Sequence, residues 1–402
     1  MAEALTPPSS KSDAHRALVL AEVCDGAHEA LLPEASARPR DVEVLSSGLR
    51  TLRGTSGAVD CLDAGAPFRF LVTQAALRPH TAWRFVGTPR LGARPHEPLF
   101  ESLRRALGVT IAHGRQPWPL AVESGARRFV GPFRVSGVES SQFASSLLLG
   151  AARLVREGAP PVTLEVEGEA TSAGYLALTV AWLARFGFTV EGDSPRLTVT
   201  RWARAEQPTA LPGDWSSLTY LLPLAWRSGA SVSHVDRGAA HPDRAFAAHL
   251  EDAGLGLSQS AGATRVTGAL QRGLQVDAAV CPDAVPALVA VALVAPAPST
   301  FVRCGVLRHK ESDRLEALVE LARLVGGAAE VEGERLVVTP PSVARGGVFD
   351  GRDDHRLVMA ATVAGALLGV TISVRGTDAV TKSFPGFWRE AAKVGIERVE
   401  AT

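Results

Sequence analysis

The sequence is poor in cysteine and has no excess of charge of either sign. Its 402 residues include four cysteines, which are scattered and show no CxxC spacing. This pattern favours neither a disulfide scaffold nor a cysteine zinc site. The 42 basic and 42 acidic residues give a formal net charge of zero. This balance argues against a nucleic-acid partner held by a global basic field, so any site for an anion must be local.

The sequence also lacks long apolar runs. No run reaches the roughly 18 residues that a membrane helix needs, and the N-terminus lacks the basic-then-apolar pattern of a secretion signal. We therefore expect a cytoplasmic protein without a membrane partner. Hydrophobic residues make up 46% of the sequence and charged residues 21%, as in globular proteins. The length allows two or more domains, each with its own core.

One stretch is dense in charge, Arg308-His309-Lys310-Glu311-Ser312-Asp313-Arg314. Apolar residues at helical spacing follow it over 315–325, so it lies at the start of a helix. A helix start offers free N–H groups and a positive dipole end, to which Lys310 and Arg314 add full cations. Glu311, a carboxylate among cations, would suit proton transfer beside an anionic substrate. The alternative is an ordinary solvated helix start.

The same arrangement recurs along the chain. Polar or glycine-containing segments precede apolar helices that we expect at 17–23, 70–77, 99–107, 143–155, 176–186, 218–226, 284–294 and 357–368. Strands are expected at 83–86, 162–166, 197–200 and 370–374. The repetition indicates a repeated β/α unit, and we infer that the helix N-termini converge on a ligand with several negative charges. Residues 204–214, which contain Pro208 and Pro212-Gly213, indicate a crossing between two halves.

Taken together, the motifs resemble the EPSP synthase family (3-phosphoshikimate 1-carboxyvinyltransferases). The resemblance runs from residue 11 to residue 387 through Lys11-Ser12, Arg16, Gly65, Arg94-Pro95, Ser140-Ser141-Gln142, Ser172, Tyr175, Pro282-Asp283, Lys310 to Arg314, Asp354-His355-Arg356 and Lys382 to Phe387. Single motifs such as Ser-Ser-Gln are weak signals. The last three motifs in register are a specific signal.

The resemblance implies an α/β fold, a two-domain inside-out α/β barrel of six βαβαββ units, three per domain, that closes at a hinge. The domains would be 11–211, on the shikimate-3-phosphate side, and 1–10 plus 212–402, with the phosphoenolpyruvate-binding cations and Glu311. The chain would cross between them near 10–12 and 210–213. A monomer is the usual state of this family.

The resemblance also implies a reaction. The enolpyruvyl group of phosphoenolpyruvate would move to the 5-hydroxyl of shikimate-3-phosphate, with release of phosphate, on the pathway to aromatic amino acids. Both partners are small anionic substrates, and no metal or organic cofactor takes part.

The resemblance assigns roles to matching positions. The expected catalytic residues are Lys11, Asp283 and Glu311. Phosphoenolpyruvate would be bound by Lys11, Gly65, Arg94, Gln142, Arg314, Arg356 and Lys382. Shikimate-3-phosphate would be bound by Lys11, Ser12, Arg16, Ser140, Ser141, Gln142, Ser172, Tyr175, Asp283 and Lys310. Arginine suits this work because its planar fork engages carboxylate and phosphate bidentately. Asp63 and His355 are secondary candidates.

Some positions depart from the family pattern. The usual Asn-Ala-Gly-Thr loop carries Asp63 and Ala66, and an aspartate there repels anions unless a neighbouring cation compensates it. Val306 stands where Asn is frequent, and Asp13 where an apolar residue is usual. These changes leave open a paralogue with a different acceptor, or a non-catalytic binding protein of the same fold. The sister UDP-N-acetylglucosamine enolpyruvyl transferases are disfavoured, because they carry a Cys before their Arg-Pro and this chain has none there.

Overall fold

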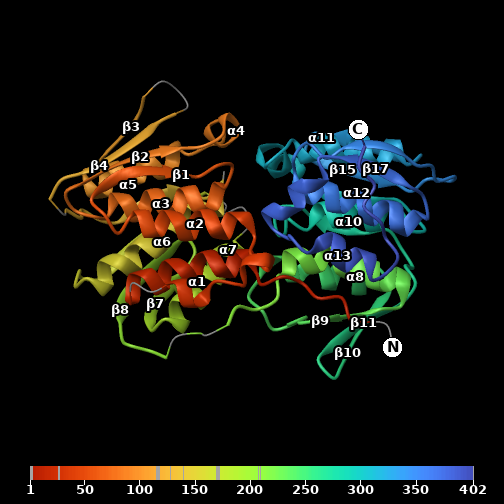
Figure 1. Ribbon diagram of the computed structural model, residues 1–402, viewed down its shortest axis with the longest axis horizontal. Helices are drawn as coiled ribbons and strands as arrows, with labels where there is room; N and C mark the ends of the chain where they lie inside the picture. Colours follow the sequence, from red (N-terminus) through yellow and green to blue (C-terminus); the bar gives the residue numbers. More distant parts are fainter. Residues whose placement is uncertain are drawn as a thin grey trace. The chain divides into compact units, whose positions relative to one another are not determined.

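The computed structural model describes residues 3–25, 28–114, 118–126, 128–138, 140–168, 173–206, 208 and 210–401. They form two compact units, drawn in Figure 1. The first unit comprises Lys11–Pro33 and Arg40–Leu211, and the second comprises Met1–Ser10, Glu34–Pro39 and Pro212–Thr402. Within the second unit, its first segment pairs with the start of its last segment, because Ser10 N donates to Pro212 O and Asp214 N donates to Pro8 O.

The helices of the first unit are α1 (Lys11–Cys24), α2 (Arg40–Thr51), α3 (Gly65–Ala76), α4 (Pro89–Gly92), α5 (Glu97–Leu107), α6 (Ser141–Arg156) and α7 (Gly174–Arg185), with the 3₁₀ turn η1 (His28–Leu31). Its strands are β1 (Ser56–Asp60), β2 (Thr81–Val86), β3 (Thr110–His113), β4 (Leu120–Ser124), β5 (Phe133–Ser136), β6 (Val162–Glu167), β7 (Phe188–Asp193) and β8 (Arg196–Trp202).

The helices of the second unit are α8 (Trp215–Ser228), α9 (Ala245–Asp252), α10 (Val285–Ala292), α11 (Arg314–Leu324), α12 (His355–Leu368) and α13 (Phe387–Ala392), with the 3₁₀ turns η2 (Ala35–Ala37), η3 (Pro242–Arg244), η4 (Cys304–His309) and η5 (Thr377–Lys382). Its strands are β9 (Ser231–Ser233), β10 (Leu255–Ser260), β11 (Ala263–Gly268), β12 (Gln275–Asp277), β13 (Ser299–Val302), β14 (Ala328–Glu332), β15 (Arg335–Thr339), β16 (Gly347–Asp350) and β17 (Ile372–Arg375).

A βαβαββ repeat accounts for most of the sheets. The sheets β1-β2-β4-β3, β5-β6-β8-β7 and β12-β13-β15-β14 share one pattern, a parallel pair followed by two antiparallel pairs. A fourth copy takes its first strand from the N-terminus, since Leu5 forms a parallel bridge with Val232 beside β9, β11 and β10. The strands β16 and β17 form a parallel pair, and Val374 of β17 also bridges Glu400.

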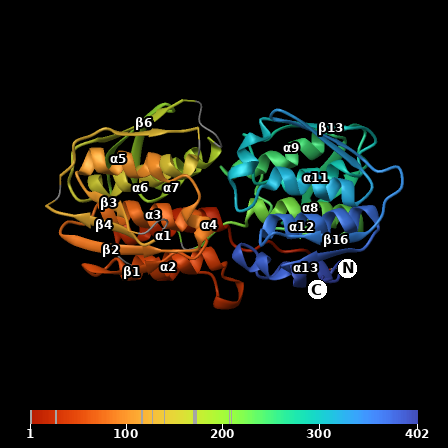
Figure 2. The same cartoon turned by 90° about the horizontal axis from the view of Figure 1, so that it is seen from above.

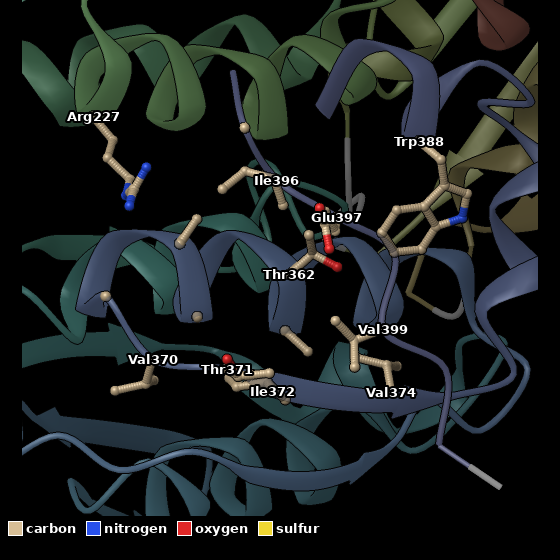
Figure 3. Close-up of a pocket in the computed structure, with 15 residues that line it drawn as sticks. Arg227, Thr362, Val370, Thr371, Ile372, Val374, Trp388, Ile396, Glu397 and Val399 are labelled. Carbon is tan, nitrogen blue, oxygen red and sulfur yellow. The ribbon is translucent and has the colours of Figure 1, made fainter. Parts of the chain in front are cut away.

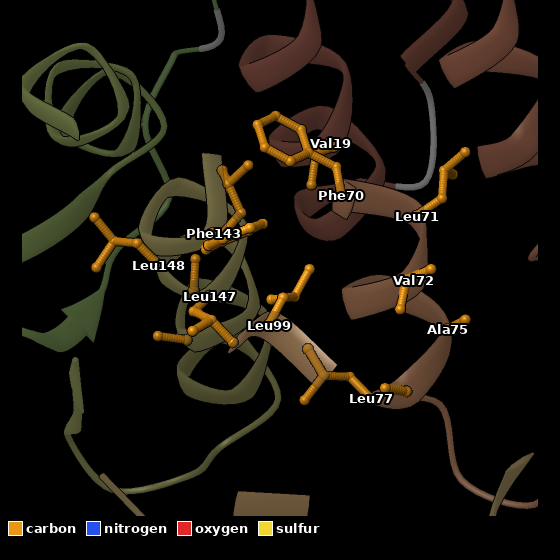
Figure 4. Packing of buried hydrophobic residues seen from close by; sticks show 14 of the residues in the cluster. Val19, Phe70, Leu71, Val72, Ala75, Leu77, Leu99, Phe143, Leu147 and Leu148 are labelled. Carbon is orange, nitrogen blue, oxygen red and sulfur yellow. The ribbon is translucent and has the colours of Figure 1, made fainter. Parts of the chain in front are cut away.

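Three helices of each unit pack on one another. These are α1, α3 and α6 in the first unit and α8, α10 and α12 in the second, where Figure 2 shows α8 beside α12. Every residue of α10 is buried, as expected of a helix that is apolar on all faces. Figure 4 shows part of the first core, in which Val19 of α1, Phe70 of α3, and Phe143 and Leu147 of α6 lie together.

Several helices begin at polar capping residues, and several end at glycine. Asp214, Ser140 and Asp354 each accept a hydrogen bond from a backbone N–H in the first turn of the following helix, which satisfies a donor with no partner inside the helix. Gly229 and Gly369 end α8 and α12 with positive φ. In the part of the chain that the structure describes, no helix is long and apolar enough to span a membrane.

The predicted helices exist, but they begin two to six residues earlier than their apolar periodicity indicated, except α10 and α11, which start within one residue of it. The first turn of a helix tolerates polar side chains, because its N–H groups have no intrahelical acceptor to lose. Lys11 is therefore the first residue of α1, and Ser12 lies inside that turn.

Candidate active site

The candidate site of the second unit is centred on Arg314, the first residue of α11, whose side chain is fully buried. Its Nε donates to Asp354 Oδ2 at 2.8 Å and its Nη2 to Asp354 Oδ1 at 3.2 Å. Nη1 donates to Asp283 Oδ1 at 2.9 Å, and Nη2 also donates to Glu311 Oε2 at 2.7 Å. Burial alone would lower the pKa of Arg314, but the three carboxylates raise it above its usual value. Arg314 thus joins the chain segments that open α10, α11 and α12.

Asp283 is a second point at which predicted residues meet. Arg356 Nη2 donates to Asp283 Oδ2 at 3.1 Å and Arg356 Nη1 to its backbone oxygen at 3.0 Å, while Lys310 Nζ lies 3.7 Å from Asp283 Oδ1. Burial disfavours the ionised carboxyl, but Arg356, Lys310 and Arg314 hold the pKa of Asp283 well below its usual value. Asp283 is therefore an ionised hydrogen-bond acceptor at neutral pH.

Asp354 has a more important structural role than the sequence indicated. It is fully buried, pairs with Arg314, and accepts from Ser312 Oγ at 2.9 Å and from Arg356 N at 3.0 Å. One carboxylate therefore caps α12 and fixes the start of α11. The residue belongs to the Asp-His-Arg motif, so its position was visible in the sequence, but its role depends on a partner 40 residues away.

The other predicted residues of this unit lie on α12 or against it. His355, the first residue of α12, is buried, and its Nδ1 lies 3.7 Å from Asp354 Oδ1. Lys382, the last residue of η5, is also buried, and η5 packs against α12.

Two buried polar residues near this array were not predicted. Tyr220 of α8 interacts electrostatically with Arg356 and Arg314, and burial raises the pKa of its hydroxyl. Asp243 of η3 accepts from Ser216 Oγ at 2.5 Å. Its pKa is raised, mainly by burial. Neither residue belongs to a charged motif, so the sequence carried no signal for them.

In the first unit, Lys11 and Arg16 of α1 are both held by neighbouring groups. Lys11 Nζ lies 3.0 Å from Asp41 Oδ2. The buried Arg16 donates from Nη1 to Ser12 O at 2.7 Å and from Nη2 to Tyr175 O at 2.9 Å. Arg16 therefore ties the first turn of α1 to the first turn of α7, which brings three of the predicted residues together.

The start of α6 carries the Ser-Ser-Gln motif. Ser140 Oγ caps the helix by accepting from Gln142 N at 3.3 Å, and Ser141 is buried in the first turn. Gln142 Oε1 accepts from Arg69 Nη1 at 2.5 Å. Arg69 of α3, which the sequence did not single out, thus orients Gln142. Ser172 lies outside the described residues.

The loop before α3 explains two features of the sequence. A Cβ on Gly65 would lie 2.4 Å from Arg94 Nη1, so glycine is what allows Arg94 to approach the start of this helix. Asp63 Oδ1 accepts from Arg40 Nη2 at 2.9 Å. The cation that compensates Asp63 is therefore Arg40, at the start of α2. Ala66 occupies the second position of α3.

The remaining departures from the family pattern are also accommodated within their own units. Asp13 Oδ1 accepts from Trp182 Nε1 at 2.7 Å, so this buried carboxylate has a donor. Val306 lies in η4 and packs against the apolar core of the second unit. Neither substitution disturbs the carboxylates and arginines described above.

The fold and these contacts define a class, α/β proteins that gather arginines, lysines and carboxylates at helix N-termini. In the described parts of the chain, no group of three or more His, Cys, Asp or Glu side chains could hold a metal ion. A model of the EPSP synthase (3-phosphoshikimate 1-carboxyvinyltransferase) family matches residues 32–391.

Known proteins resemble the chain over nearly its whole length. The 3-phosphoshikimate 1-carboxyvinyltransferase of Methanosphaerula palustris is 32% identical, with 98% of this chain and 97% of the relative covered. That of Methanopyrus kandleri is 34% identical, with 97% and 95% covered. The solved EPSP synthase of Acinetobacter baumannii matches with a TM-score of 0.72 at 18% identity, covering 98% of this chain and 96% of that one.

The chain belongs to the EPSP synthase family. The predicted family and the α/β fold class are thereby confirmed. A further solved structure with this fold is the enolpyruvyl transferase NikO of Streptomyces tendae, with a TM-score of 0.66 at 17% identity over 98% of this chain and 95% of that one.

We expect Arg314→Ala to lower the free energy of unfolding of the second unit by about 3–5 kcal/mol, because it leaves the buried Asp354 without its cation. Chemical denaturation measures this loss. The matched control is Arg237→Ala, which removes an exposed pair with Glu251 at 2.7 Å and should cost about 1 kcal/mol or less. Equal effects of the two variants would contradict the structural role of Arg314.

Proposed function

We propose that the protein transfers the enolpyruvyl group of phosphoenolpyruvate to the 5-hydroxyl of shikimate-3-phosphate and releases phosphate, on the pathway to aromatic amino acids. The observation that carries this proposal is the array of Arg314, Arg356 and Lys310 around Asp283 and Glu311. Both substrates are polyanions, which cations at helix N-termini stabilise. Relatives of 32% and 34% identity named for this reaction support the same substrates.

The proposed binding residues divide between the units. In the second unit, Arg356 and Lys382 would bind the phosphate and carboxylate of phosphoenolpyruvate. Arg314 would act mainly by positioning Asp283 and Glu311, because its guanidinium already makes four hydrogen bonds to carboxylates. The first unit would contribute Lys11, Gly65, Arg94 and Gln142 to the same substrate.

Shikimate-3-phosphate would be bound by the hydroxyls and amide at the starts of α1, α6 and α7, with Asp283 and Lys310 of the second unit. Ser140, Ser141 and Ser172 would meet its 3-phosphate. Arg16 is buried with its guanidinium bonded to Ser12 O and Tyr175 O. Its proposed part is therefore to hold these two residues in place.

The chemistry requires balanced proton traffic. The 5-hydroxyl oxygen attacks C2 of the enolpyruvyl group while its proton is removed and another proton is added to C3. Phosphate then leaves as a proton is lost from the new methyl group. Asp283 has a low pKa, so it is a weak base and would orient the hydroxyl as an acceptor. Glu311 and Lys11 would then move the protons.

We propose that the protein works as a monomer in the cytoplasm and needs neither a metal nor an organic cofactor. The assay below therefore contains no added metal or cofactor.

The test of the function is phosphate release from phosphoenolpyruvate and shikimate-3-phosphate, with the product identified by mass. We expect one phosphate for each enolpyruvylshikimate-3-phosphate formed. Binding of phosphoenolpyruvate without release would indicate a different acceptor. Absence of both binding and release would indicate a protein that kept the fold without the chemistry.

Glu311→Gln should lower kcat by about 10²- to 10⁴-fold with little change in KM, because the amide keeps the shape but cannot move a proton. Steady-state kinetics with both substrates measures the two constants separately. The control is Glu316→Gln, in the first turn of the helix α11 that follows Glu311, where the carboxylate is exposed and pairs with Arg352. A rise in KM alone would limit Glu311 to substrate positioning.

Arg40→Gln should raise KM for phosphoenolpyruvate roughly two- to fivefold, because the uncompensated charge of Asp63 then repels the anion and exposed pairs are worth up to about 1 kcal/mol. The side chains are 45% and 24% exposed. Adding Asp63→Asn should return KM toward the original value. A double variant no better than Arg40→Gln would show that the charge of Asp63 is not what the anion senses.

A further inference from the structure

A cavity of about 300 Å³ lies in the second unit. Its lining includes the C-terminal half of α12, whereas the array around Arg314 contacts the start of that helix. One wall is the C-terminal half of α12 and the strand β17. The opposite wall is formed by Trp388 of α13 and by residues 395–399, which follow that helix and pair with β17 through Val374 N and Val399 O at 2.9 Å. Figure 3 shows these walls and the side chains on them.

Most of the lining is apolar. Ile372, Val374, Ile396 and Val399 contribute side chains, and Trp388 contributes its indole ring. The indole Nε1 donates to Thr377 O at 3.3 Å, so the ring is held by its own unit. Small residues of α12 leave the space open, among them Ala361, Gly365 and Ala366. A volume of this size is at the lower end of the range found for small-molecule sites.

Two opposite charges line the same cavity. Arg227, near the end of α8, and Glu397, in the segment after α13, are both exposed. Neither makes a hydrogen bond or an ion pair with the described part of the chain, so both side chains are available to a ligand. In Figure 3, Arg227 reaches toward one end of the cavity, and Glu397 lies on the side of Trp388.

We propose that this cavity binds a small zwitterion with an apolar body. Its anionic group would pair with Arg227, whose planar fork suits a carboxylate. Its ammonium group would pair with Glu397, and its apolar body would lie against Trp388 and the aliphatic side chains of β17. The enolpyruvyl transfer proposed above does not use any of these residues, so the two proposals can be tested separately.

The two charges decide between ligand classes. A simple carboxylate would be attracted by Arg227 but repelled by Glu397. A simple amine would be attracted by Glu397 but repelled by Arg227. A neutral apolar molecule would gain nothing from either charge, which would stay solvated by water. Only a molecule that carries both signs, separated by an apolar chain, satisfies all three parts of the lining.

The test is calorimetric titration of the full chain with three matched probes, 8-aminooctanoate, octanoate and octylamine. We expect 8-aminooctanoate to bind roughly two- to fivefold more tightly than either single-charge probe, because an ion pair with an exposed side chain adds only a few-fold in affinity. Equal affinity for all three probes would overturn the proposal.

Variants locate the site. Arg227→Gln and Glu397→Gln should each weaken 8-aminooctanoate binding roughly two- to fivefold, while phosphate release from phosphoenolpyruvate and the melting temperature stay unchanged. The matched controls, Arg272→Gln and Glu330→Gln, alter exposed charges of the same unit outside the cavity and should bind the probe normally. Unchanged affinity in both cavity variants would overturn the proposal.

Two further measurements separate this cavity from the proposed active site. Ala366→Phe should fill the cavity and abolish probe binding with phosphate release retained. Saturating phosphoenolpyruvate and shikimate-3-phosphate should leave the affinity for 8-aminooctanoate unchanged. Competition by either substrate would place the probe among the residues of the proposed function and would overturn the proposal.

Discussion

The buried guanidinium of Arg314 is the constraint on which the second unit depends. A charge with no solvent exposure is stabilised when carboxylates neutralise it and accept its hydrogen bonds. Asp354, Asp283 and Glu311 do so from the segments that open α12, α10 and α11. Because all three must reach one planar group, the starts of three helices are fixed in place. The same contacts keep Asp283 ionised and direct Arg356 toward it.

The location of this array follows from the repeat. The central helices α1, α3, α6, α8, α10 and α12 are enclosed by other elements of their units and are apolar along most of their length. Polar side chains are then compatible with burial mainly in the first turn, where free N–H groups and the positive dipole end favour anions. A fold of buried helices therefore gathers its chemistry at helix N-termini, whatever ligand it serves.

The sequence predicted what is local and missed what is paired at a distance. Helices, the fold class and the motif residues could be predicted, because apolar periodicity and short motifs are properties of neighbouring residues. The helix starts were set too late, since polar residues such as Lys11 also fit a first turn. The organising part of Asp354 depends on a guanidinium 40 residues away. The β-bridge between Leu5 and Val232 joins residues that are even farther apart in the sequence, and no local pattern predicts it.

The charged residues that depart from the family pattern have partners within the described part of the protein, whereas the two charged residues that line the cavity do not. Asp63 departs from its family pattern, yet Arg40 of the same unit neutralises it, and Asp13 is matched by the indole of Trp182. Such pairs make a substitution tolerable without a ligand, because the protein itself supplies the partner. Arg227 and Glu397 differ, since they face one apolar cavity with no partner in the described chain. Because both side chains are exposed, water solvates them in the empty cavity, and a ligand would replace that water with charged groups of its own.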